Sequence, residues 1–151
     1  MTYRFERSTK EDAAEIMERL DKEIVAQLYD FRPFDTEEMI VDLIESSEEA
    51  WSVFNDTGIL VIFGIIRPSL LTDKGWPWLI SSTEIGKHKR NLMKGCAIVV
   101  EYWLKQYSVL ENYIPTGFSR FLRWAEWNGF TVHEPVHGTG GRLFHRVEKR
   151  R

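Results

Sequence analysis

The chain alternates between two spacings of apolar residues, and each spacing predicts one kind of element. In four stretches, apolar residues recur every three or four positions, which is typical of amphipathic helices. In seven other stretches, short runs rich in β-branched and aromatic residues are bounded by Gly, Pro, Asn or Asp, which is typical of strands. The predicted strands are 3–7, 50–54, 59–66, 76–82, 109–115, 130–136 and 142–147.

The predicted helices begin and end at local signals. Ser8 and Glu11 have the spacing of a capping box for the first helix, Pro33 separates it from the second, and Thr36 is the expected N-cap of the second. Gly129 is placed to end the fourth helix, 118–128. The apolar faces are Ala13, Met17, Leu20, Ile24 and Leu28 in the first helix, Met39, Ile40, Leu43 and Ile44 in the second, and Leu92, Cys96, Val99, Trp103 and Tyr107 in the third, 87–107.

Written in chain order, these elements predict an α/β (α+β) fold, β-α-α-β-β-β-α-β-α-β-β, with a mixed sheet. The turn "NDTG" at 55–58 joins two strands into a hairpin, and "HGTGG" at 137–141 joins the last two strands. The 151 residues are enough for one domain with a core and contain no repeat or linker, so 1–151 is predicted to be a single domain.

Composition and charge narrow the classes of partner. The formal net charge of −3 gives no overall basic field, so no nucleic-acid partner is expected. The single cysteine, Cys96, allows no disulfide within the chain, and "MTYRFERSTKED" lacks the apolar core of a signal peptide, so both favour the cytoplasm. The longest apolar run, "GILVIFGII", is too short to cross a bilayer as a helix, so no membrane partner is expected.

No metal site is expected from the histidines or from the cysteine. His133 and His137 are four residues apart, but they belong to a predicted strand with Pro135 between them, where that spacing has no meaning for a metal. Cys96 falls on the apolar face of the helix 87–107, where a cysteine usually packs as a small hydrophobe rather than acting as a nucleophile.

The stretch "SSTEIGKHKRNLMKG" at 81–95 is the leading candidate for a binding site. It connects the strand 76–82 to the helix 87–107 and carries Lys87, Lys89, Arg90 and Lys94 with no acid after Glu84. The N-terminus of a helix attracts phosphates through its free N–H groups and its dipole. The alternative is the solvated first turn of an ordinary helix, because charge runs are usually solvated faces.

The element order and several short patterns resemble the GNAT superfamily, the fold of acyl-CoA-dependent N-acyltransferases. More closely, "WPWLISS", "GKHKRNLMK", "VVEYWLKQY" and "ENYIPTGFSRFLRWAEWNGFTVHE" resemble the GNAT-like proteins of short-tailed bacteriophages. The resemblance implies a mixed, mostly antiparallel sheet flanked by helices, acetyl-CoA as acyl donor without a metal, and an amine of a protein or small molecule as acceptor. It also implies the cytoplasm of a host cell or a virion as the location, and a host protein as acceptor or binding target.

The resemblance assigns binding residues to the segment after the fourth strand. The residues that would face the pantetheine arm of acetyl-CoA are Leu79, Ile80, Ser81 and Ser82. The residues that would surround the pyrophosphate are Gly86, Lys87, His88, Lys89, Arg90 and Asn91.

The sequence departs from the family pattern in this loop. The usual loop reads Gln/Arg-x-x-Gly-x-Gly/Ala, and its glycines let backbone N–H groups approach the phosphates. Here "KHKRNLMKG" offers Lys87 or Arg90 for the first position and lacks the close glycines. Two outcomes fit this departure. Either Lys and Arg side chains replace the backbone contacts with charge-assisted ones, or the large side chains close the site.

The positions that carry chemistry in the family are also incomplete. The Tyr that protonates the leaving thiolate would fall near Trp124, Ala125 and Glu126, and the frequent Asn at the start of that helix near Phe118, so neither is matched. The remaining candidates for the proton transfers are Glu84, Glu111 and Tyr113, each at or near the end of a strand.

Three hypotheses follow from these observations. The first is an acetyl-CoA-dependent N-acetyltransferase. The second is a catalytically degenerate GNAT-fold phage protein that binds a host protein or forms part of a virion, with the seven acids and no Lys or Arg of residues 35–49 as a docking face. The third is an unrelated small α+β domain.

Overall fold

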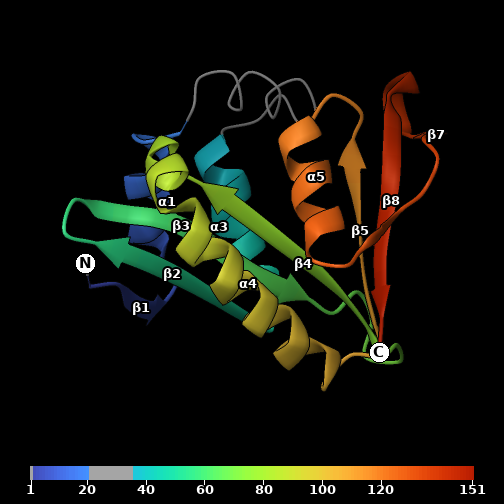
Figure 1. Ribbon diagram of the computed structural model, residues 1–151, viewed down its shortest axis with the longest axis horizontal. Helices are drawn as coiled ribbons and strands as arrows, with labels where there is room; N and C mark the ends of the chain where they lie inside the picture. The colour runs from blue at the N-terminus through green and yellow to red at the C-terminus, as the bar shows by residue number, and fades with distance from the viewer. Residues whose placement is uncertain (1, 21–35) are drawn as a thin grey trace. The chain divides into compact units, whose positions relative to one another are not determined.

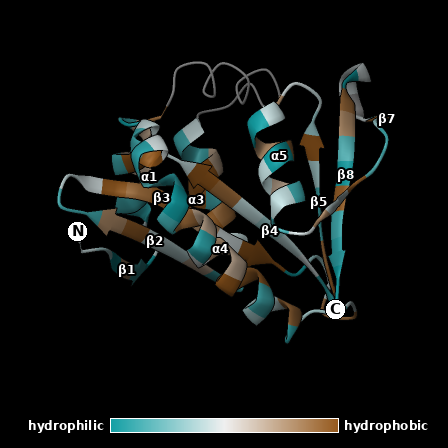
Figure 2. Ribbon diagram, viewed as in Figure 1, coloured by the Kyte–Doolittle hydropathy of each residue, from teal (hydrophilic) through white to brown (hydrophobic). Residues whose placement is uncertain are grey.

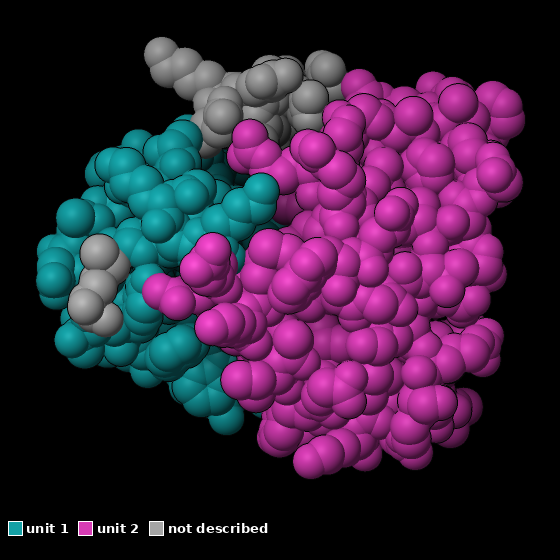
Figure 3. Space-filling model, viewed as in Figure 1, with its two compact units in different colours: residues 1–66, 78–89 teal, residues 67–77, 90–151 magenta. Residues whose placement is uncertain are grey.

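A computed structural model of the chain describes residues 2–20 and 36–151. Within it the chain forms two compact units, residues 1–66 with 78–89, and residues 67–77 with 90–151 (Figure 3). Each unit is made of two separate stretches of the chain. The single domain expected for 1–151 therefore stays a prediction.

The first unit is built on an antiparallel hairpin that the sequence predicts. It contains β1 (Arg4–Arg7), β2 (Glu49–Asn55) and β3 (Gly58–Ile66), with β1 paired to β2 and β2 paired to β3. The turn between β2 and β3 ends at Gly58, whose φ of +129° is one that residues with a side chain rarely adopt. The end of β4 (Lys74–Ser81) and the 3-10 helix η1 (Thr83–His88) complete this unit.

Two helices, α1 (Lys10–Met17) and α3 (Thr36–Ser46), pack their apolar residues against β3 in the first unit. Burial of these apolar side chains is the main force that holds the unit together. The buried cluster consists of Ala13, Ile16, Leu20, Ile40, Phe54, Ile59, Ile62 and Ile80. Trp78 also belongs to this unit, and its ring lies so close to Gly64 that a Cβ there would come within 2.8 Å of it.

The capping box of α1 lies one residue later than the sequence predicts. Thr9 is the N-cap, with Asp12 N–H donating to Thr9 Oγ1 at 3.3 Å and Thr9 N–H donating to Asp12 Oδ2 at 3.0 Å. Ser8, the predicted cap, instead donates its backbone N–H to the Ala50 carbonyl, which keeps it in strand pairing. α1 ends at Met17, and the predicted apolar positions Ile24 and Leu28 lie outside the described residues.

The second unit contains the other half of the strands. β5 (Val109–Pro115) pairs antiparallel with β8 (Leu143–Arg150), and β6 (Thr131–Val132) and β7 (Val136–His137) pair antiparallel with β8. The beginning of β4 pairs parallel with β5. The strand order is β1-β2-β3-β4-β5-β8-β6, so the predicted mixed, mostly antiparallel sheet is confirmed (Figure 1).

Two helices belong wholly or mainly to the second unit. They are α4 (Lys89–Leu104) and α5 (Ser119–Trp127). α4 buries Val100, Trp103 and Leu104, and Tyr107 just beyond it is 1% exposed. Of the predicted apolar face, Trp103 and Tyr107 are buried, whereas Leu92, Cys96 and Val99 are half-buried. Figure 2 shows hydrophobic residues along β3 and hydrophilic residues along most of β8. β8 therefore presents mainly polar side chains.

Several predicted boundaries differ from those of the structure; the last strand, for example, covers Leu143–Arg150 rather than 142–147. The third helix begins at Lys89 rather than residue 87 and ends at Leu104, because 83–88 forms η1 instead of a free loop. The fourth strand covers Lys74–Ser81 rather than 76–82. The predicted strand 130–136 is split into β6 and β7, because it contains Pro135, which has no N–H to donate to a strand ladder.

Candidate functional site

The parallel ladder between β4 and β5 is only two residues long. It joins Lys74 to Val109 and Gly75 to Leu110. Two residues later Asn112 Nδ2 donates to the Pro77 carbonyl at 2.6 Å, so a side chain contacts β4 where a backbone group would continue the ladder. The same amide accepts the N–H of Tyr113 on its Oδ1 at 2.7 Å. The parallel pairing therefore ends before the segment predicted to face pantetheine.

The end of β4 is buried, and the two backbone N–H groups that follow it are hydrogen-bonded. The predicted pantetheine residues Ile80 and Ser81 are each 9% exposed, Ser82 is 2% exposed, and Leu79 is half-buried. Ser82 N–H donates to the Leu60 carbonyl at 2.8 Å, and the next N–H, of Thr83, donates to the Arg19 carbonyl at 3.0 Å. These bonds fix the strand end to the first unit.

The Ser82 hydroxyl is the exception at this strand end. Its Oγ is buried and has no hydrogen-bond partner among the described residues. A buried polar atom without a hydrogen-bond partner lowers the free energy of unfolding by about 1–3 kcal/mol, so most such atoms in proteins are hydrogen-bonded to a protein group or an ordered water. The orphaned hydroxyl fits a strand end that receives a polar group from outside the chain.

The segment 83–88, expected to be an open phosphate loop, is wound into η1. A 3-10 helix uses its N–H groups in bonds to carbonyls three residues earlier, as Ile85 N–H does to the Ser82 carbonyl at 3.2 Å. Backbone N–H groups are therefore largely unavailable for phosphates here. Beside Gly86 there is open space, since a Cβ at that position would meet none of the described atoms within 4 Å.

Exposed cationic side chains follow η1 at the start of α4. Lys89 and Arg90 are the first two residues of α4, and Lys94 lies four residues after Arg90, on the same side of the helix. All three are exposed, and none has an ion-pair partner within residues 2–20 and 36–151. Lys87 is different, because its Nζ lies 3.3 Å from Glu84 Oε2. The predicted residue Asn91 is exposed in the first turn of α4.

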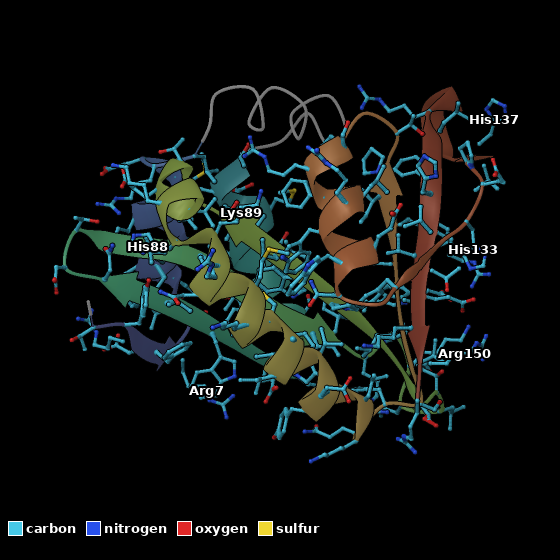
Figure 4. All side chains as sticks on the ribbon, in the orientation of Figure 1. Arg7, His88, Lys89, His133, His137 and Arg150 are labelled. Atoms are coloured by element: carbon cyan, nitrogen blue, oxygen red, sulfur yellow. The ribbon has the colours of Figure 1, made fainter. Side chains whose placement is uncertain are left out.

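His88 is the one predicted phosphate residue that turns inward. It is 6% exposed, and its ring nitrogens lie 2.7 Å from Tyr3 Oη and 3.1 Å from Asn55 Nδ2. Figure 4 labels His88 and the neighbouring Lys89. Its neighbours in the chain, Lys87 and Lys89, are both exposed. The structure therefore separates the predicted cation cluster into outward-facing residues and one inward anchor.

The three candidates for proton transfer have different surroundings. Glu84 is paired with Lys87, as described above. Glu111 Oε2 lies 3.3 Å from Arg146 Nη1 and 3.8 Å from Lys74 Nζ, and its side chain is 12% exposed. Tyr113 is 50% exposed and lies two residues from Glu111 on β5, so both side chains are on the same face of the sheet.

The sequence analysis missed a charged network on this face of β5 and β8. Glu148 lies directly opposite Glu111 and contacts His133 Nε2 and Arg146 Nη1, both at 2.9 Å, and Arg150 Nη2 at 3.3 Å. Part of this network can be predicted from the sequence, because residues at every second position of a strand share one face. In "HRVEKRR", Arg146, Glu148 and Arg150 have this spacing.

The network shifts the titration of two of its members. Partial burial favours a higher pKa for Glu148, but the hydrogen bond from His133 and the charges of Arg146 and Arg150 outweigh it and lower the pKa of that carboxyl. Desolvation alone would lower the pKa of Arg146. The neighbouring Glu148 and Glu111 reverse this and raise the pKa of the guanidinium. The network is therefore a stable set of opposite charges at neutral pH.

Within the described residues, neither the cysteine nor the potential metal ligands indicate a second site. Burial raises the pKa of the Cys96 thiol from 9.0 to about 12, so it is not an activated nucleophile. In the described part of the chain, no three His, Cys, Asp or Glu residues are grouped so that they could hold a metal ion. No described helix combines the length and apolar character needed to span a membrane.

Comparison with known proteins identifies the fold. No protein-family model and no curated protein sequence matches the chain. Among solved structures, spermidine N-acetyltransferase from Vibrio cholerae, in complex with CoA and spermine, is similar with a TM-score of 0.72 at 10% identity, over 98% of this chain and 95% of that one. Ard1 from Thermoplasma volcanium is similar with a TM-score of 0.72 at 10% identity, over 99% and 98%.

A third solved structure agrees with these two. An acetyltransferase of the GNAT family from Streptococcus pneumoniae is similar with a TM-score of 0.62 at 14% identity, over 99% of both chains. At such low identities the similarity establishes the fold and not the activity. The chain therefore shares the fold of these solved structures over nearly its whole length.

Proposed function

We propose that the protein is an N-acetyltransferase that takes an acetyl group from acetyl-CoA and transfers it to an amine. The observation that carries the proposal is the set of exposed cations Lys89, Arg90 and Lys94 at the start of α4, directly after η1 and the buried end of β4. In a chain with the GNAT fold, this is the place that the family resemblance assigns to the pyrophosphate of CoA.

The residues present fit acetyl-CoA in three respects. The cations offer charge-assisted hydrogen bonds to phosphate oxygens. The open space beside Gly86 leaves room for a ligand at the segment. The orphaned Ser82 hydroxyl offers a donor and acceptor at the end of the strand that would receive the pantetheine arm. When bound, acetyl-CoA would supply the thioester whose acyl group is transferred.

The acceptor must lose a proton before it can attack the thioester, because an ammonium group has no lone pair. Glu111 and Tyr113 share a strand face, so we assign the proton transfers to this pair in preference to Glu84. Glu111 Oε2 is engaged by Arg146 and Lys74, whereas the Tyr113 side chain is half exposed. Tyr113 is therefore the group that we expect to reach a reacting atom.

Calorimetric titration with CoA and with acetyl-CoA tests the binding step. We expect saturable binding at or below millimolar concentration. Release of free CoA thiol in the presence of a panel of peptide and small-molecule amines then tests transfer. The absence of any CoA or acetyl-CoA binding at near-millimolar concentration would end the proposal.

A catalytically degenerate protein of the same fold is the second candidate. Two observations favour it: η1 occupies the place of the glycine-rich loop, and the segment expected to hold the thiolate-protonating Tyr has Trp124, Ala125 and Glu126 instead. In this hypothesis the chain is a short-tailed phage protein that binds a host protein, with exposed acids of α3 such as Glu37 and Glu38 as the docking face.

The two candidates predict different outcomes of one pair of experiments. A degenerate protein forms a complex of fixed stoichiometry with its partner, and the complex survives Arg90→Ala and Lys94→Ala. An acetyltransferase instead leaves acetylated amines on its target, and the two substitutions reduce their formation. Acetylation that depends on added protein and acetyl-CoA would exclude the degenerate hypothesis.

A further inference from the structure

His88 makes contacts that the proposed phosphate role does not explain. Its Nδ1 lies 2.7 Å from Tyr3 Oη, and the two rings meet edge to face with their centroids 5.5 Å apart. Its Nε2 lies 3.1 Å from Asn55 Nδ2. Three separate segments therefore meet at this ring: the residue before β1, the end of β2, and the last residue of η1.

The orientation of Asn55 fixes the protonation of His88. Asn55 Oδ1 accepts the backbone N–H of Thr57 at 2.9 Å and the Thr57 hydroxyl at 2.7 Å, so the Nδ2 group must face the histidine. An amide nitrogen can only donate, so His88 Nε2 must accept. In a neutral imidazole the proton then resides on Nδ1, which donates to Tyr3 Oη. This tautomer is inferred from the hydrogen-bond network.

His88 lies at the junction between η1 and α4, so its hydrogen bonds hold this junction. His88 is the last residue of η1, and Lys89 is the first residue of α4. Both ring nitrogens are held by the first unit, so the backbone at this junction is held as well. The ring of His88 points inward, and the flanking side chains of Lys87 and Lys89 are exposed.

We propose that His88 is a positioning residue. The Tyr3–His88–Asn55 contacts, which we call the histidine clamp, hold the start of α4 so that Lys89, Arg90 and Lys94 can bind one diphosphate together. The proposal rests on the proposed CoA-binding function and deepens it. It also changes the role that the family resemblance assigns to His88, from contact with the pyrophosphate to support of the residues that make that contact.

The first test measures the tautomer of His88 in the histidine clamp and needs no ligand. Long-range 1H–15N correlation spectra of the full chain report which nitrogen of each neutral imidazole carries the proton. We expect the Nδ1–H form for His88, and its loss or mixture with the Nε2–H form in Asn55→Ala. A wild-type His88 found in the Nε2–H form would overturn the clamp.

The second test separates positioning from stability. Tyr3→Phe keeps the edge-to-face ring and removes only the hydroxyl, while His88→Phe keeps a ring and removes both nitrogens. His137→Phe is the matched control, because His137 is an exposed histidine of β7. All variants are measured at a temperature at which thermal melts show them fully folded.

In folded His88→Phe we expect the KM for acetyl-CoA and the Kd for CoA to rise about tenfold, and in Tyr3→Phe we expect both to rise less. The kcat of both variants should stay within about twofold of wild type. The reason is that misplaced binding groups weaken a contact that several cations share. His137→Phe should match wild type. A purely structural clamp would lower the melting temperature and leave KM unchanged, and that result would overturn the proposal.

The outcomes also distinguish the two levels of inference. If wild-type protein binds no CoA, the proposed function falls and the positioning role falls with it. If wild type binds CoA and folded His88→Phe binds it equally well, only the positioning role falls.

Discussion

Removal of the cations at the start of α4 should weaken CoA binding in a salt-dependent way. The perturbation is Arg90→Ala combined with Lys94→Ala, two exposed residues on one side of the helix. A pair of unit charges about 4 Å apart near water interacts with about 1 kcal/mol, and exposed pairs rarely exceed this. Each cation therefore contributes about fivefold in affinity, and the two together about 25-fold at low salt.

Lys105→Ala provides the matched control for loss of positive charge. Lys105 is an exposed lysine just beyond the end of α4, 15 residues after Arg90. At a rise of 1.5 Å per residue it lies about 22 Å away along the helix axis. This exceeds two screening lengths at physiological salt, so its removal should change CoA affinity by less than about twofold.

The assay is titration calorimetry of CoA at a series of salt concentrations. The screening length falls from about 30 Å at 0.01 M to about 3 Å at 1 M salt, so the 25-fold loss should shrink to about twofold at high salt. A backbone cradle would show little such dependence. An equal loss at all salt concentrations, or an equal loss in Lys105→Ala, would show that Arg90 and Lys94 do not bind CoA through their charges.

Three further predictions concern single groups. Ser82→Ala should leave the melting temperature of the ligand-free protein unchanged or raised, because the hydroxyl has no partner in the described chain, while the thermal shift caused by CoA decreases. Glu148→Gln should lower the free energy of unfolding at pH 7. The pKa of Glu148 is lowered in the folded state, so its stabilising effect is present above the usual pKa of about 4.3 and disappears as pH falls through the lowered value; in urea unfolding, the difference between variant and wild type should shrink steadily as the pH is lowered below about 4.3. Cys96 should react with a thiol reagent at pH 8 about 1000-fold more slowly than an ordinary thiol, because its pKa is about 12 instead of 9.0, and the difference should vanish in denaturant.

Local patterns were enough to predict most elements. The predicted strand 109–115 matches β5 residue for residue, and the "NDTG" hairpin and the helix end at Gly129 are present as expected. These features depend on neighbours within a few residues, namely turn chemistry and alternating burial. Predictions were wrong where a residue forms a hydrogen bond with a residue far away in the chain. Ser8 is not the cap, because its hydroxyl is hydrogen-bonded to Ser52 Oγ and its N–H to the carbonyl of Ala50, 42 residues away in the chain.

The candidate site was predicted in part. The location of the cation cluster after the fourth strand, and its lack of close glycines, follow from the sequence alone. The burial of His88 does not, because its partners Tyr3 and Asn55 are 85 and 33 residues away. The network around Glu148 was missed because it joins β5, β8 and the residue after β6. The register that brings these residues together depends on how the strands pair, which the sequence of a single strand does not show.

Most of the order and kind of the elements, the clustering of positive charge at one strand-to-helix junction, and the absence there of close glycines can be read from the sequence alone. Only the tertiary structure decided how that junction is built. The N–H groups of Ser82 and Thr83 go to the carbonyls of Leu60 and Arg19, η1 forms in place of an open loop, and His88 turns inward. The physical reason is that a buried backbone or imidazole nitrogen must find a partner wherever the fold places one. Periodicity records which residues are apolar, but it does not record which distant carbonyl or side chain lies within hydrogen-bonding distance.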